Sequence, residues 1–490
     1  MNSTLQASRV GFGAKLRRVV SDSTVRGTLT LASFTGLGAL AMMAAAPVLT
    51  RLFTPEIFGI VAVYTSIVSI AAPVGCLRYD LAILLPEEEN VAVSLLQLSL
   101  LILLSVCAVL ALVIWLWSKQ IAVWLNCEGL ASYLWMAPLG VLGGGAYQAL
   151  SGWALRKEAY GKIARTRFSQ NAGMAVTQIG LGALLSGNPA GLLIGDLVGR
   201  FGGVGLLLRY AWPSLTAERP SYDVMRASAR RYAKFPFYST PASLLTAIGT
   251  QIPTILLSRY FGPAVAGWYA LTYRVLRTPT AFLGQAAAQS LFANAARISR
   301  DRERLQKLTE RATIVLMAVG LPVFALVTQE GGELFARAFG PDWKQAGIYA
   351  QILSPWLFVL FVANPLSNLL TVREWQGTTL VYSTLECVTA VTCLVIGVAY
   401  HSDLIALGAL GGGACLLELV TMNRFFKAGF TNAGRIVKQA APLLVPLAFC
   451  ALLAESRFGG PGMWPLALRV TAFAIVYLLS LWKLRRFASA

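Results

Sequence analysis

Four of the 41 lysines and arginines lie inside long apolar segments: Arg200, Arg274, Arg277 and Arg469. A charged side chain in an apolar medium is costly unless it faces water or a partner, so such positions are functional candidates by default. Guanidinium groups bind phosphates and carboxylates through paired, charge-assisted hydrogen bonds. The chemistry that these residues predict is therefore recognition of a negatively charged group. No role is assigned to Arg469.

Arg274 and Arg277 share one face of a predicted helix over residues 264–288. Counted from the start of that helix, Arg274 lies about 15 Å along its axis and Arg277 one turn further. Small or polar residues occupy the same face: Gly267, Ala270, Ala281, Gly284 and Gln285. Two arginines on such a face predict the wall of a cationic, water-filled cavity. In the alternative interpretation, they form buried ion pairs with Glu386 or Glu418.

Three further ionisable residues fall in or next to apolar segments. Asp196 precedes Arg200 by four residues, a spacing that favours an ion pair within one helix. Arg200 is nevertheless a third candidate for the cationic wall. Asp80 follows the segment 56–77, where it is either a group that titrates or an interfacial anchor. Asp80, Asp196 and Glu386 are thus candidates for ion coupling or for charge pairing.

Other site chemistries lack their residues. The single histidine cannot build a metal site alone, and the seven cysteines contain no CxxC pair. Sequence motifs for phosphate-binding loops, zinc proteases, nucleophile elbows and dinucleotide folds are absent. We therefore expect neither a metal nor a cofactor.

The composition indicates the medium in which these residues work. Of 490 residues, 56% are apolar and 13% charged, whereas soluble proteins carry about 25% charged residues. This composition excludes a soluble enzyme, a disordered chain and a disulfide-rich secreted module. It predicts an all-α polytopic membrane protein with about 14 helices, each of about 20 residues.

Apolar runs bounded by charges, glycine and proline predict where these helices lie. The predicted spans are 27–50, 56–77, 91–117, 130–153, 169–187, 190–211, 237–258, 264–288, 312–330, 346–371, 378–399, 404–423, 440–455 and 463–482. They group into an N-lobe (1–213, six helices), a cytoplasmic linker (214–236) and a C-lobe (237–424, six helices). A final pair of helices with a cytoplasmic tail completes the chain (425–490).

The distribution of basic residues predicts the orientation of the chain. With both termini in the cytoplasm, 31 of the 41 lysines and arginines fall in inward-facing segments and 6 in outward-facing ones. This bias follows the positive-inside rule. The net charge of +19 therefore indicates contact with anionic lipid headgroups, and nucleic-acid binding is not expected.

A short sequence recurs in related form, with six identities in fourteen positions. Leu49–Pro55 recurs 208 residues later as Leu257–Pro263, and the glycine and alanine that follow, Gly59 and Ala62, recur as Gly267 and Ala270. Each copy lies after the first helix of a six-helix set, which predicts two lobes related as parallel repeats. In the alternative interpretation, this pattern simply makes a good interfacial turn, since proline starts the next helix.

Four stretches of the sequence together carry a resemblance to a known family: Leu49–Gly59, Leu77–Pro86, Phe339–Pro355 and Asn364–Ser367. With them the chain resembles the polysaccharide-transport family, whose members are O-antigen or exopolysaccharide flippases. Its superfamily also holds multidrug and toxin extrusion antiporters and lipid II flippases. The family's motifs are mainly structural, so no catalytic residue can be transferred from it.

The resemblance implies translocation of an undecaprenyl-pyrophosphate-linked oligosaccharide from the cytoplasmic to the periplasmic leaflet of the bacterial inner membrane. Alternating access of a two-lobe cavity would carry the substrate, with Arg200, Arg274 and Arg277 facing its pyrophosphate. Polysaccharide polymerase and chain-length machinery are the implied partners. Two alternatives stay open: a multidrug or cation antiporter of the same superfamily, and a membrane-embedded polysaccharide polymerase or ligase.

Overall fold

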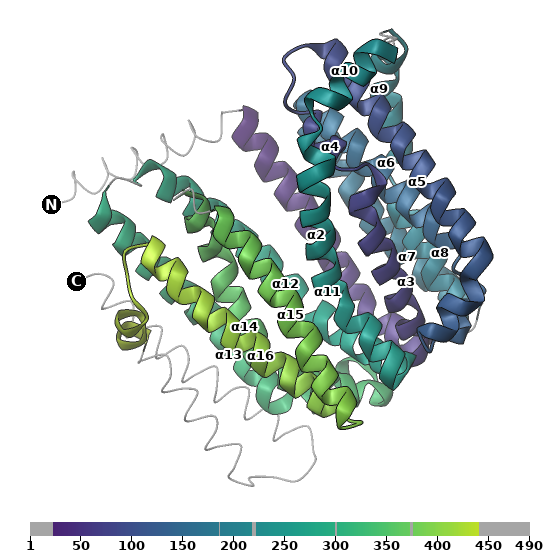
Figure 1. The fold of residues 1–490 in the computed structure, drawn as a ribbon. Helices are drawn as coiled ribbons and strands as arrows, with labels where there is room; N and C mark the ends of the chain where they lie inside the picture. The colour runs from purple at the N-terminus through teal and green to yellow at the C-terminus, as the bar shows by residue number, and fades with distance from the viewer. Residues whose placement is uncertain (1–22, 186, 218–221, 299–300, 373–375, 441–490) are drawn as a thin grey trace, which may run out of the picture. The chain divides into compact units, whose positions relative to one another are not determined.

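The computed structural model describes residues 23–185, 187–217, 222–298, 301–372 and 376–440. This part of the chain consists of helices joined by turns (Figure 1). The predicted spans 440–455 and 463–482 lie outside it, except for residue 440. The all-α architecture predicted from the composition is confirmed.

The chain divides into two compact units. The first comprises Met1–Phe53 and Val63–Ala247, and the second comprises Thr54–Ala62 and Ile248–Ala490. Helices α3 and α11 each have residues in both units. The division into parts ending at residues 213, 236, 424 and 490 stays a prediction.

The first unit is built from α2 to α10. Within it α7 lies between α2 and α8, and α5 packs on α6 and α10. The helices are α2 (Ser23–Leu52), α3 (Pro55–Gly75), α4 (Tyr79–Ala82), α5 (Glu89–Trp124), α6 (Met136–Arg156), α7 (Tyr160–Leu184), α8 (Pro189–Phe201), α9 (Val204–Ala217) and α10 (Tyr222–Arg231). A 3-10 turn, η1 (Glu128–Leu130), precedes α6, and a π-helical turn, η2 (Phe235–Ser239), follows α10.

The second unit has α14 at its centre, in contact with α12, α13 and α16. Its apolar stretch is accordingly the most enclosed of the candidate spans, with 56% of the residues buried. The helices are α11 (Thr240–Phe261), α12 (Pro263–Arg297), α13 (Arg302–Phe339), η3 (Pro341–Trp343), α14 (Lys344–Val372), α15 (Gln376–Ala399) and α16 (Asp403–Ala428). A further helical segment covers residues 433–440.

Nine helical segments in the described residues are long and apolar enough to cross a membrane. Helices α6, α7 and α12 have 21, 25 and 35 residues and are not among them. Each is long enough to cross, since about 20 residues suffice. Glycines in α6 and basic residues in α7 lower the apolarity of these two helices.

Helix ends follow local chemistry. Proline opens α3, α8 and α12, where its missing N–H is no loss. Asn188 and Asp301 accept hydrogen bonds from the backbone N–H of Ala190 (2.9 Å) and Arg304 (3.1 Å), which satisfies donors that the first turn leaves unpaired. The predicted span 190–211 is broken into α8 and α9 because Gly203 adopts a φ of 88°, a conformation that only glycine adopts freely.

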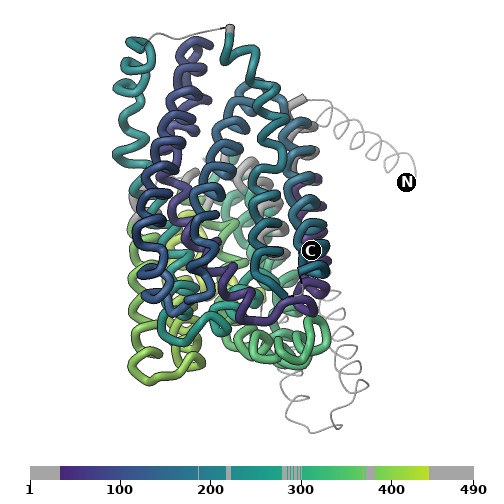
Figure 2. The backbone as a smooth tube through the Cα atoms, turned by 90° about the vertical axis from the view of Figure 1, so that its right-hand side faces the viewer, coloured from purple at the N-terminus to yellow at the C-terminus, as the bar shows by residue number. Residues whose placement is uncertain are grey.

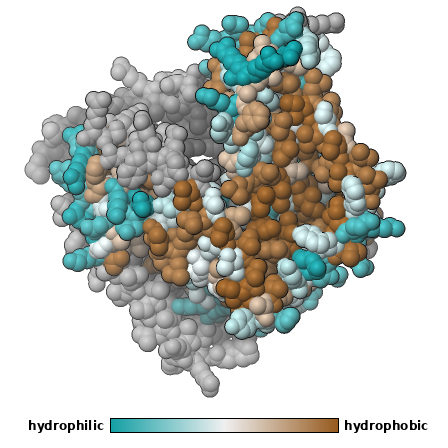
Figure 3. Space-filling view, viewed as in Figure 1, coloured by the Kyte–Doolittle hydropathy of each residue, from teal (hydrophilic) through white to brown (hydrophobic). Residues whose placement is uncertain are grey.

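Large apolar side chains cover much of the exposed surface. Trp115, Val176, Leu416 and Val420 are exposed by 67% or more. Figure 2 shows the helices of each unit running alongside one another. In Figure 3 the described surface of the first unit is hydrophobic along these helices and hydrophilic at the end that carries α10. Such a surface is suited to hydrocarbon and not to water.

Candidate functional site

Helix α12, which carries Arg274 and Arg277, is fixed against neighbouring backbone by two hydrogen bonds. Thr272 Oγ1 donates to the carbonyl of Ala346 (2.6 Å), and Trp268 Nε1 donates to the carbonyl of Asp342 (3.0 Å). Both acceptors lie in the segment that contains η3 and the first turn of α14. These bonds set the rotation of α12 about its axis, and with it the direction of both arginines.

A row of aromatic rings leads to Arg277. Tyr269 and Tyr273 stack with their centroids 5.8 Å apart, and Tyr273 stacks on Trp356 of α14 at 6.5 Å. The guanidinium carbon of Arg277 lies 5.1 Å from the centre of the Tyr273 ring, and its Nη1 donates to the Tyr273 hydroxyl. The ring therefore holds the guanidinium through cation–π attraction and a hydrogen bond.

Two carboxyl groups complete this part of the second unit. Glu386 of α15 is close enough to Arg277 for their charges to attract, and its side chain hydrogen-bonds to that of Glu418 in α16. Arg274, one turn before Arg277, is half-buried. Arg277 thus lies within electrostatic reach of Glu386, which is joined to Glu418. The buried ion pair of the alternative interpretation stays a prediction. The contact of either arginine with a substrate stays a prediction.

Asp196 and Arg200 form a separate group in the first unit. Arg200 Nε lies 2.6 Å from Asp196 Oδ2, and the two side chains are 23% and 7% exposed. The ion pair within α8 that the spacing favoured is therefore present. A carboxylate so enclosed needs this partner, because a buried charge without one is strongly destabilising.

Asp80 belongs to a third group, between α3 and α5. It is 4% exposed, and Gln148 Nε2 donates to its carboxylate at 2.8 Å. Burial raises the pKa of Asp80 above its ordinary value, an effect that the nearby charge of Arg78 opposes. Arg78 itself adopts a left-handed φ of 59°, and its Nε donates to Ser243 Oγ of α11 (2.9 Å). Asp80 is thus a buried carboxyl with a hydrogen-bond partner in α6, and its roles in ion coupling or as an anchor stay predictions.

The sequence reasoning missed the aromatic row and the partner of Asp80. The aromatic row could have been predicted from the spacing of its residues. Intervals of four residues place Tyr269, Tyr273 and Arg277 on one face of a helix. No signal pointed to Gln148, which comes from α6. Among the described residues no group of three or more His, Cys, Asp or Glu side chains could hold a metal ion.

The family of the chain follows from comparison with known sequences. The model of a family described as polysaccharide biosynthesis protein matches residues 48–347. The chain belongs to this family. The match includes α3 to α13 and both arginines of α12, and it confirms the resemblance seen in the motifs.

Two curated relatives are similar to this member of the polysaccharide biosynthesis protein family. The lipopolysaccharide biosynthesis protein WzxC of Escherichia coli (strain K12) is 24% identical over 179 residues, 36% of each chain. The succinoglycan biosynthesis transport protein ExoT of Rhizobium meliloti (strain 1021) is 25% identical over 324 residues, 62% of this chain and 61% of ExoT. The matches therefore span between about a third and three fifths of the length of these relatives.

Solved structures share the fold. The lipid II flippase MurJ in an inward closed conformation has a TM-score of 0.73 at 10% identity, covering 94% of this chain and 100% of MurJ. A multidrug resistance MATE family transporter in an inward-facing conformation has a TM-score of 0.58 at 14% identity, with coverage of 82% and 96%. At these identities the likeness establishes the fold alone: an all-α polytopic membrane protein.

Proposed function

We propose that the chain is a flippase that moves an undecaprenyl-pyrophosphate-linked oligosaccharide from the cytoplasmic to the periplasmic leaflet by alternating access. The observation that carries the proposal is the family match over residues 48–347. The printed functions of the relatives support it: one is a lipopolysaccharide biosynthesis protein and another a succinoglycan transport protein. The fold is also that of a protein that flips lipid II, MurJ.

The proposed contacts with the pyrophosphate are Arg274 and Arg277. A pyrophosphate crossing the membrane needs cationic partners that hold its oxygens. The row of rings gives Arg277 an orientation before any anion arrives, so less freedom is lost on binding. Arg200 stays a third, weaker proposal, because its Nε already bonds to Asp196.

Asp80, Asp196 and Glu386 are the residues that we propose for coupling transport to an ion or for charge pairing. The site of action is the bacterial inner membrane with both termini in the cytoplasm, and polysaccharide polymerase and chain-length machinery are the proposed partners. As a transporter, the chain would catalyse no covalent step, so no cofactor is needed.

One observation favours a second candidate, a multidrug or cation antiporter. The carboxyl groups of Glu386 and Glu418 hydrogen-bond to each other in the second unit, and a carboxylate pair suits a cationic cargo. The arginine beside that pair opposes this function, because it would repel a cation. The flippase is therefore the preferred proposal.

Deletion of the gene distinguishes these functions. A flippase mutant should accumulate lipid-linked oligosaccharide in the inner leaflet, detected by radiolabelled sugar in extracted lipids and by its protection from an impermeant periodate reagent. Loss of an antiporter should instead raise intracellular dye or drug. Normal levels and normal sidedness of the lipid-linked intermediate would refute the flippase.

The arginines are tested in the complemented deletion strain. Arg274→Ala and Arg277→Ala should each reduce surface polysaccharide at least about tenfold, since loss of a charged partner of the pyrophosphate costs several times the thermal energy. Arg337→Ala is the matched control, because Arg337 is exposed at the end of α13. Membrane abundance is measured by immunoblot. Full surface polysaccharide in both variants would exclude these contacts.

A further inference from the structure

The two copies of the repeated sequence adopt the same local structure. In each copy a helix ends just before a proline, and that proline begins the next helix: Pro55 begins α3 and Pro263 begins α12. Gly59 and Gly267 each lie four residues after this proline, so each stands one turn into its helix. The repeat therefore extends from sequence to structure.

The two glycines contact each other's copy reciprocally. A Cβ added to Gly59 would overlap the carbonyl oxygen of Pro263 and lie 3.0 Å from its Cα. A Cβ added to Gly267 would overlap the carbonyl oxygen of Pro55 and lie 2.9 Å from the backbone nitrogen of Gly59. Only hydrogen fits at either position, so the backbones of α3 and α12 meet directly, as small residues allow in membrane helices.

The same short segment supports the contact from both helices. Phe58 of α3 packs edge-on against Trp343 of η3, with centroids 4.8 Å apart. Trp268 of α12 donates to the carbonyl of Asp342, the residue before Trp343. Trp343 is itself 1% exposed. The residues beside both glycines are thus positioned by η3, so the contact is a built junction.

Both glycines, both prolines and η3 lie in the second unit. Beyond Ala62, however, α3 belongs to the first unit. Helix α3 therefore connects the junction directly to the first unit. A shift of one helix along the other would bring the Cβ of a neighbouring residue into the space of a glycine, so sliding is blocked while the two backbones stay in contact.

We propose that Gly59 and Gly267 form a two-position closure, made in the conformation described here and broken in another conformation of the transport cycle. The proposal rests on the proposed alternating access. It makes the glycines positioning residues that contact no substrate. An alanine at either position excludes the closed junction and shifts the protein towards the conformation in which the first turns of α3 and α12 are apart.

The test measures the distance between spin labels on cysteines placed at Thr54 and Tyr260, which are both exposed, in a background without native cysteines. The parent protein should show a short-distance population. Gly59→Ala and Gly267→Ala should each reduce it about tenfold or more, because overpacking of this kind shifts a two-state equilibrium by at least that factor. Gly408→Ala and Gly412→Ala are matched controls, since an added Cβ meets nothing within 4 Å there, and both should retain the parent distribution.

A second variant covers the case in which alanine at a glycine prevents folding. Phe58→Ala removes the ring that packs on Trp343 without adding a clash, and it should also reduce the short-distance population. Unchanged distances in all three junction variants would overturn the closure. Because the distances are measured without substrate, they are independent of the flippase proposal: shifted distances in a chain that moves no lipid-linked oligosaccharide would refute only the flippase.

Discussion

Charged side chains inside the apolar helices are held by neighbours of this same chain. Arg200 pairs with Asp196, and Arg277 lies against Tyr273 within the field of Glu386. These partners reduce the cost of placing a guanidinium in a medium that solvates it poorly. The same partners also hold the guanidinium in a fixed orientation. The contacts that stabilise the charge in the folded protein therefore also prepare it to bind an anion. For Arg277 the partner is mainly an aromatic ring, which leaves more of the guanidinium charge available to an anion than the carboxylate beside Arg200 does.

Asp80 should make the stability of the protein depend on pH. Burial raises the pKa of this carboxyl above its ordinary value of 3.8, so the folded state binds the proton more tightly than the unfolded chain. The contribution of Asp80 to stability is then complete below about pH 3.8 and falls as the pH rises to the folded-state pKa, above which it stays constant. Asp80→Asn should remove this fall, because the amide mimics the protonated acid and still accepts from Gln148.

The measurement for Asp80 is the melting temperature of detergent-solubilised protein across that pH range. Asp223→Asn serves as the control, because Asp223 lies exposed on α10 and should leave the pH dependence of the parent protein intact. The same pH slope in Asp80→Asn as in the parent protein would show that Asp80 does not titrate in this range.

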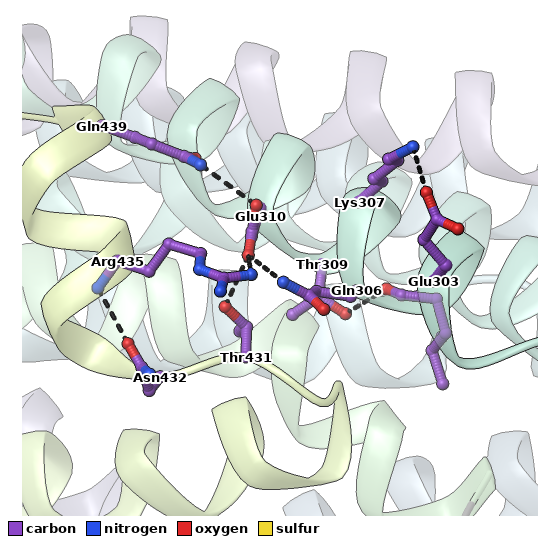
Figure 4. A network of polar contacts seen from close by, with 10 residues as sticks. Glu303, Gln306, Lys307, Thr309, Glu310, Thr431, Asn432, Arg435 and Gln439 are labelled. Carbon is purple, nitrogen blue, oxygen red and sulfur yellow. Dashed lines mark hydrogen bonds and ion pairs between the residues drawn. The ribbon is translucent and has the colours of Figure 1, made fainter.

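At the scale of elements, one carboxylate fastens the segment after α16 to α13. Glu310 accepts hydrogen bonds from Thr431 (2.8 Å) and Gln439 (3.1 Å) of that segment and from Gln306 of its own helix (2.9 Å), as Figure 4 shows. Arg435 lies 3.6 Å from the same carboxylate. Further along α13, Ala440 packs with Ala318 and Leu321. The segment therefore follows α13, joined first by polar and then by apolar contacts.

Replacing Glu310 should detach this segment. Glu310→Ala leaves three donors without their acceptor and should lower stability by about 1–3 kcal/mol, since enclosed polar groups that lose a partner cost this much. The control is Glu303→Ala on the same helix. Glu303 pairs with Lys307 (2.6 Å), and the two side chains are 77% and 74% exposed, respectively. Because exposed ion pairs contribute little to stability, Glu303→Ala should not change the stability measurably.

Thermal melting of both variants in detergent gives the comparison for Glu310. Limited proteolysis supplies a second readout, because a detached segment should be cleaved near residue 432 faster in Glu310→Ala than in the parent protein. Equal melting temperatures for the Glu310 and Glu303 variants would mean that the polar network does not hold the segment.

The sequence predicted elements better than their ends or their contacts. Helices lie at each of the twelve predicted spans up to residue 423, because apolar runs report which segments enter a membrane. They do not report helix length: α13 extends from Arg302 to Phe339 beyond the predicted 312–330, since polar residues continue the helix outside the apolar run. The break at Gly203 was not predicted either, because a glycine within an apolar run is compatible with a continuous helix.

The candidate site was predictable only in part, for the same reason. Arg274, Arg277 and Glu386 were found because charge stands out in an apolar segment. The stack of Tyr273 on Trp356 and the bond from Gln148 to Asp80 join residues far apart in the sequence, and aromatic or amide side chains do not stand out there. The reciprocal fit of Gly59 and Gly267 depends on how two helices cross, which no local pattern encodes.

For the whole molecule, orientation in the membrane is the property that the basic residues predict. Helix α13 has 38 residues and is therefore about 57 Å long, well beyond the hydrocarbon thickness of about 30 Å. Arg302 begins this helix, and Lys344 follows its end after the short η3. Because α13 is long and apolar enough to cross a membrane, we expect the two residues on opposite sides of it. The excess of lysine and arginine in the inward-facing segments predicts that Arg302 lies in the cytoplasm.

A labelling experiment in intact cells tests this orientation. An impermeant maleimide should label a cysteine at Lys344 strongly and one at Arg302 only after permeabilisation. The reverse pattern would invert the whole topology, and with it the assignment of both termini to the cytoplasm.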